Sequence, residues 1–95
     1  MVRSIEKKYV KFLTYRNMDQ KIIEDVKRVA YEVLKDERAL SEENFNMTDS
    51  ENMDSIHRVS ILTALEEEYD IIFKLKEISS WNTVNELAII LEKKL

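Results

Sequence analysis

Apolar residues recur at the helical period of 3.6 residues in three segments, with polar residues between them. The stripe of the first segment consists of Ile22, Val26, Val29 and Val33. Asn17 followed by Gln20 has the spacing of a capping box, in which two side chains satisfy free amide groups at the start of a helix. We therefore predict a helix over residues 18–35.

The second and third segments show the same period, and each is preceded by a capping residue. The stripe of the second is Val59, Leu62, Leu65 and Tyr69, and that of the third is Val84, Leu87, Ala88 and Leu91. Asp54 stands where an N-cap belongs, which predicts a helix over residues 55–69. Thr83 and Glu86 form a second capping box, which predicts a helix over residues 83–94.

Two connections join these helices. Residues 36–54 are mostly polar and acidic, and we expect a long first loop that Leu40 and Phe45 hold across the open end of the bundle. Residues 70–82 are too apolar for a simple loop, and we expect a short helix near residues 74–80, because no second strand is available for pairing. The apolar side chains expected to be buried there are Ile71, Ile72, Phe73, Leu75, Ile78 and Trp81.

Composition restricts the chemistry of a 95-residue chain that is long enough for one domain. It has no Cys, which excludes disulfides and thiolate chemistry, and no Gly, which excludes phosphate-cradling Gly loops. His57 is its single histidine, so a multi-His metal site is excluded. The sequence has no apolar run long enough to span a membrane and no visible secretory signal. We expect a cytoplasmic, all-α, monomeric protein with no stable membrane insertion.

Charge separates the chain into a basic extension, residues 1–17, and a domain, residues 18–95. The extension has five basic residues and one acidic residue, whereas the domain has ten basic and eighteen acidic residues. Such a domain repels nucleic acids and attracts basic protein surfaces. Three interpretations of the extension stay open: a helix on the domain or a frayed end, translation from Met18, or a basic amphipathic helix on a membrane or partner.

Enzyme and metal templates do not fit the sequence. Ser55 and His57 point about 200° apart on one helix, so they do not form a nucleophile and its base. An EF-hand loop starting at Asp49 would have Asp54 where Gly is required. We therefore expect a protein with no catalytic residue and no metal site. Two alternatives stay open: a catalytic pair among the nineteen acidic residues, and weak, unspecific binding of divalent cations by the acidic loop.

The order of the remaining motifs resembles the acyl carrier protein family over residues 18–95. Asp54-Ser55-Ile56 stands where that family has Asp-Ser-Leu at the head of its second helix. Residues 64–70, Ala-Leu-Glu-Glu-Glu-Tyr-Asp, are close to the Ala-Leu-Glu-Glu-Glu-Phe-Asp of many members, and Thr83-Val84 opens the last helix at the matching distance. The resemblance implies a four-helix acyl-carrier-like bundle with three main helices, one short helix and a long first loop.

The resemblance also implies a function. A phosphopantetheinyl transferase would attach 4′-phosphopantetheine from coenzyme A to Ser55, and acyl groups would be carried on it as thioesters between acyl-transferring and acyl-modifying enzymes. The pathway would be fatty acid, polyketide or related specialised biosynthesis. Residues at the matching positions of the family's recognition helix are Asp54, Ile56, Val59, Glu66 and Glu67. Val59, Leu62, Phe73, Ile78 and Trp81 would line a cleft for the acyl chain or form ordinary core.

The chain departs from the family pattern around this helix. Asn52 and Met53 replace a frequent Gly, and Asn52 is expected to tolerate left-handed backbone at that turn. Five residues stand where members of the family often have acidic ones: His57, Arg58, Ser60, Lys74 and Lys76. These changes favour a docking face altered for other partners, hence a specialised carrier. Two alternatives stay open: an aminoacyl carrier of the D-alanyl or peptidyl kind, and an unmodified helical interaction module with an acidic docking face.

Overall fold

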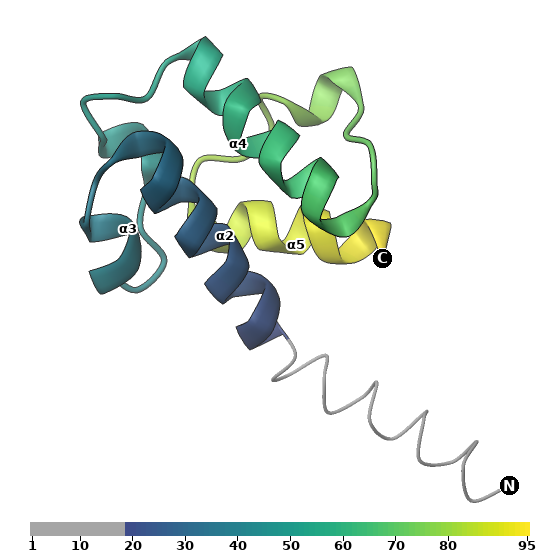
Figure 1. The fold of residues 1–95 in the computed structure, drawn as a ribbon, viewed down its shortest axis with the longest axis horizontal. Helices are drawn as coiled ribbons and strands as arrows, with labels where there is room; N and C mark the ends of the chain where they lie inside the picture. Colours follow the sequence, from purple (N-terminus) through teal and green to yellow (C-terminus); the bar gives the residue numbers. More distant parts are fainter. Residues whose placement is uncertain (1–18) are drawn as a thin grey trace, which may run out of the picture.

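The computed structural model describes residues 19–95, and the predictions for residues 1–17 and for the Asn17 cap lie outside this range. Within it the chain is helical and has no strand (Figure 1). The elements are α2 (Asp19–Leu34), α3 (Arg38–Ser41), the 3₁₀ turn η1 (Met47–Asp49), α4 (Ser55–Tyr69), the 3₁₀ turn η2 (Leu75–Glu77) and α5 (Val84–Lys94). The all-α prediction and the three main helices are confirmed.

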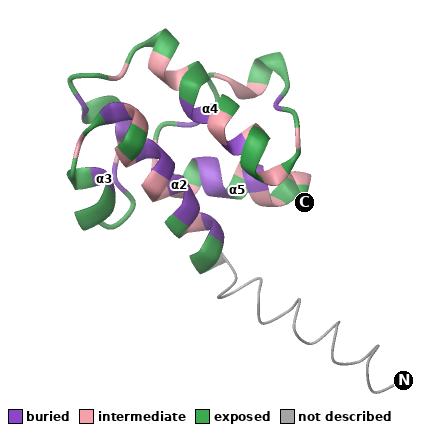
Figure 2. Ribbon diagram, viewed as in Figure 1, coloured by how far each residue is buried: buried purple, intermediate pink, exposed green. Residues whose placement is uncertain are grey.

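The core lies where α2, α4 and α5 face one another (Figure 2). α2 packs against α3, α4 and α5, so it is the central helix of the described part. The fully buried side chains with the largest volumes include Trp81, Phe45, Leu34, Met47, Ile61, Leu65, Leu87 and Leu91. Burial of these side chains supplies the main stabilisation of the bundle.

Local capping explains where the helices begin and end. Asp54 has extended backbone, and its Oδ1 accepts a hydrogen bond from the His57 amide at 2.8 Å, which starts α4. The capping box at α5 is also present, because Thr83 Oγ1 accepts from the Glu86 amide and Glu86 Oε1 accepts from the Thr83 amide. Asp70 ends α4 in the left-handed conformation with φ 57°, a role that glycine often takes.

The first connection has more structure than the sequence predicted. It contains α3 and η1, and it is joined to the start of α5 by hydrogen bonds from the Met47 amide to the Asn82 carbonyl and from the Val84 amide to the Phe45 carbonyl. Phe45 is buried as predicted. The prediction for Leu40 is wrong: its side chain is exposed, because α3 directs its neighbour Ala39 into the core instead.

The second connection is also irregular, and its predicted helix at residues 74–80 is reduced to the single turn η2. Phe73 and Trp81 are buried as predicted, while Ile71 and Ile78 are half-buried. The predicted burial of Ile72 and Leu75 is wrong, since Ile72 is 80% exposed and Leu75 is 84% exposed. Residues 71–74 have no helical structure, and the segment directs Phe73 inward and Ile72 outward.

Candidate functional site

Ser55 is the first residue of α4, a helix of 15 residues, and it follows the extended Asp54 directly. The residue is exposed, and its hydroxyl makes no hydrogen bond with any residue between 19 and 95. The helix is already capped by Asp54, so the Ser55 hydroxyl is not required for capping. An accessible, unpaired hydroxyl in this position is available to an enzyme that would modify it.

Asp54 and His57 form a pair beside this hydroxyl. The Nδ1 atom of His57 lies 2.7 Å from Asp54 Oδ1, the same oxygen that accepts from the His57 amide. Hydrogen bonds from the His57 amide and from its ring hold the pKa of the Asp54 carboxyl below its usual range. The imidazole is thus engaged with Asp54, and no hydrogen bond joins it to Ser55 within the described residues.

The predicted partner-binding residues fall into two groups. Ile56 and Val59 are exposed on the first half of α4, with Ile56 73% exposed. Glu67 is exposed further along the helix. Glu66 differs, because it is half-buried and its Oε2 accepts a hydrogen bond from the Phe73 amide at 2.8 Å. Glu66 therefore also anchors the connection that follows α4.

Two departures from the family pattern have structural roles that the sequence did not reveal. Arg58 is half-buried, and its Nη1 donates to the carbonyls of Trp81 at 2.6 Å and Ile78 at 3.3 Å, so its charge is directed at residues 78–82. The left-handed backbone that Asn52 was expected to tolerate is not used at this turn, because its φ is not positive. Its side-chain amide instead donates to the Leu34 carbonyl at 2.6 Å, which satisfies a free carbonyl at the end of α2.

Residues predicted to line an acyl cleft belong mainly to the core. Leu62, Phe73 and Trp81 are buried, Ile78 is half-buried and Val59 is at the surface. Two cavities lie elsewhere: an open polar basin of about 660 Å³ between residues 35–38 and 49–52, and an apolar one of about 110 Å³ between α2 and α5. The Trp81 Nε1 group is buried and has no hydrogen-bond partner.

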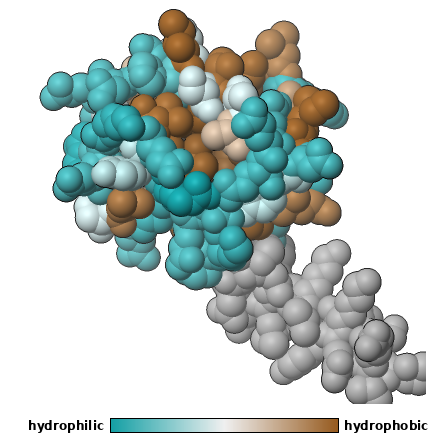
Figure 3. All heavy atoms as spheres, viewed as in Figure 1, coloured by the Kyte–Doolittle hydropathy of each residue, from teal (hydrophilic) through white to brown (hydrophobic). Residues whose placement is uncertain are grey.

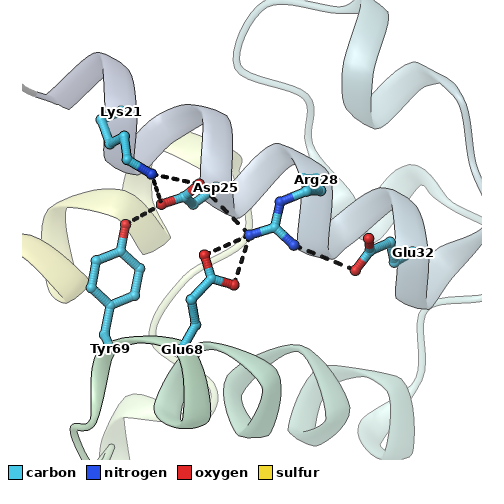
Figure 4. A network of polar contacts seen from close by, with 6 residues as sticks. All are labelled: Lys21, Asp25, Arg28, Glu32, Glu68 and Tyr69. Carbon is cyan, nitrogen blue, oxygen red and sulfur yellow. Dashed lines mark hydrogen bonds and ion pairs between the residues drawn. The ribbon is translucent and has the colours of Figure 1, made fainter.

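A polar network fixes α4 against α2 (Figure 4). Arg28 Nη2 lies 2.6 Å from both carboxylate oxygens of Glu68, and the Tyr69 hydroxyl donates to Asp25, which is buried. Burial alone would raise the pKa of Asp25, but hydrogen bonds from Tyr69 and Lys21 outweigh it and lower that pKa. Burial, together with the bond to Asp25, raises the pKa of Tyr69. The helical spacing of Lys21, Asp25, Arg28 and Glu32 was the available sequence signal for the part of this network that lies within α2.

The described residues contain no cluster of His and acidic side chains that could hold a metal ion. In that same range, no helix has the length and apolar character required to cross a bilayer. Comparison of the chain with family models, with curated proteins and with solved structures finds no match in any of the three.

Proposed function

We propose that this chain is a carrier protein that receives 4′-phosphopantetheine on Ser55 and carries acyl groups as thioesters for fatty acid, polyketide or related biosynthesis. The observation that supports this most is the exposed and unpaired hydroxyl of Ser55 at the head of α4. It follows an Asp that caps the helix, within a helical domain whose sequence order resembles that of acyl carrier proteins. In this role the chain is a substrate of other enzymes and has no catalytic residue of its own.

Two features of the residues around Ser55 fit an attached 4′-phosphopantetheine group. Ser55 Oγ would hold it covalently, and the start of a long helix favours the negative charge of a phosphate. Asp54 places a carboxylate next to that charge, but His57 lies against the carboxylate and offsets it when protonated. The prosthetic group supplies the thiol that a chain without Cys lacks.

Partner enzymes would recognise the exposed first half of α4. Ile56 and Val59 offer apolar contacts there, and Glu67 offers a negative charge farther along. The formal net charge of −4 would steer the chain toward basic surfaces, which speeds encounter without requiring tight binding. Modest affinity suits a carrier, because it must leave each enzyme after transfer.

The test is intact-protein mass spectrometry after incubation with coenzyme A and a broad-specificity phosphopantetheinyl transferase. We expect a single mass gain of one phosphopantetheine in the wild type and in Ser60→Ala, which removes another exposed hydroxyl of α4. Ser55→Ala should show no gain. A gain that persists in Ser55→Ala would contradict the assignment of the site.

A second function is favoured by one observation, the 73% exposure of the apolar Ile56 in the first turn of α4. An unmodified interaction module would use the same face for constitutive docking. No mass gain in a folded protein, with a positive control for the transferase, would favour this function. If the group is attached, loading assays with acyl and aminoacyl donors would separate an acyl carrier from an aminoacyl carrier.

A further inference from the structure

The segment that follows α4 presents two large apolar side chains to solvent. Ile72 and Leu75 are the two most exposed large hydrophobic residues among those the structure describes, at 80% and 84%. Figure 3 shows apolar atoms standing out at the upper right of the molecule, where Figure 1 places this segment. Neither of the two cavities described above is lined by them. They protrude from the surface.

The segment is held in place by hydrogen bonds from its two central residues, Phe73 and Lys74, which lie between Ile72 and Leu75. The Phe73 amide donates to Glu66 Oε2 at 2.8 Å, and the Phe73 side chain is buried. The Lys74 amide donates to Glu77 Oε1 at 2.7 Å. The exposure of Ile72 and Leu75 is therefore a property of an anchored segment, and little ordering is required when it binds a partner.

The charge of this surface is opposite to that of the domain as a whole. Lys74 and Lys76 are exposed, and neither forms an ion pair with another described residue. Glu77, the acidic residue that follows them, is neutralised by Lys94 of α5 at 2.9 Å. Interactions between exposed charges are screened beyond about 8 Å at physiological ionic strength, so the nearby lysines count most.

We propose that this basic apolar edge, Ile72, Lys74, Leu75 and Lys76, binds the surface of an anionic phospholipid bilayer. Protruding aliphatic side chains enter the boundary between headgroups and acyl chains, which is fluid and requires no complementary groove. The flanking lysines contact the negatively charged headgroups. The binding is peripheral and reversible. It does not depend on modification of Ser55, so it can be tested independently of the carrier function.

Vesicle sedimentation with the full chain tests this proposal. We compare vesicles of phosphatidylcholine alone with vesicles of phosphatidylcholine and phosphatidylglycerol in equal amounts. The wild type should bind the anionic vesicles more tightly, and added salt should weaken the binding. The charge variant K74Q/K76Q should bind them about 25-fold more weakly, at about fivefold per lysine. The apolar variant I72S/L75S should lose at least about tenfold.

Matched controls lie away from the edge. Ile89→Ser replaces an exposed aliphatic residue of α5 that borders the small cavity, and Lys35→Gln replaces an exposed lysine after α2. Both should bind within about twofold of the wild type, and circular dichroism should show that every variant is folded. Ser55→Ala should also bind normally, which separates this result from the carrier test.

Three outcomes would overturn the proposal. The first is equal affinity for neutral and anionic vesicles. The second is unchanged binding by both edge variants, which would assign binding to another part of the chain such as residues 1–17. The third is no binding to either vesicle, which would leave an acidic protein surface as the partner to test.

Discussion

The guanidinium group of Arg58 lies over the indole ring of Trp81, with Cζ 4.3 Å from the ring centroid. The same group donates a hydrogen bond of 2.6 Å to the Trp81 carbonyl. One side chain of α4 thus holds both the ring and the backbone of a connection that has little regular structure of its own. A cation above an aromatic face is further stabilised when it is partly removed from water, as Arg58 is.

Arg58→Met keeps much of the apolar stem but removes the hydrogen bonds and the charge. We expect the free energy of unfolding to fall by about 1.5–3 kcal/mol, the range for hydrogen bonds that involve a charged group. Urea denaturation measures it, and Lys76→Met, at an exposed position, is the control. Equal stability of the two variants would show that Arg58 does not hold the connection.

Tyr69→Phe tests the network between α2 and α4. It removes the hydroxyl that donates to the buried Asp25, which keeps Lys21 at 3.1 Å and Arg28 at 3.6 Å as partners. We expect a loss of about 1–3 kcal/mol in the free energy of unfolding. Tyr31→Phe is the matched control, because the Tyr31 hydroxyl makes no hydrogen bond within the described residues. A larger loss in the control would refute this role for Tyr69.

Asp54→Ala and Ser55→Ala separate capping from modification at adjacent positions. Asp54→Ala removes the cap of α4 and should lower Tm by about 4–8 °C, as loss of an N-cap does in a domain of this size. Ser55→Ala should leave Tm nearly unchanged, because its hydroxyl has no partner among the described residues. Thermal melting by circular dichroism measures both. A large fall in Ser55→Ala would mean that Ser55 is mainly structural.

Asp36 makes stability depend on pH in the acid range. Hydrogen bonds from the Arg38 side chain lower the pKa of Asp36 to about 2 in the folded protein. The unfolded chain has a pKa of about 3.9 for Asp, so this contribution is complete above that pH and is lost as the pH falls toward the folded value. Between these two pH values, the urea midpoint should fall less steeply with decreasing pH in Asp36→Asn than in the wild type. An identical slope in both proteins would contradict this assignment.

Much of the helical architecture could be predicted from the sequence because it depends on neighbouring residues. The apolar period of α2, α4 and α5 is local, and so are the caps Asp54 and Thr83. The position of Ser55 at the head of α4 followed from the same signals. Its proposed role rests on the resemblance of its surrounding motif to acyl carrier proteins.

Only the tertiary structure decided what the two connections do. Leu40, Ile72 and Leu75 are as apolar as the core residues, yet they are exposed. The chain around Ile72 and Leu75 is positioned by Glu66, which accepts from the Phe73 amide, and by Lys94, which pairs with Glu77. Leu40 lies on α3, which places its neighbour Ala39 in the core. Arginine is usually a surface residue, yet Arg58 is half-buried and donates to the carbonyls of Ile78 and Trp81, which lie 20 and 23 residues farther along the chain. Long-range packing sets these orientations, and no local pattern records them.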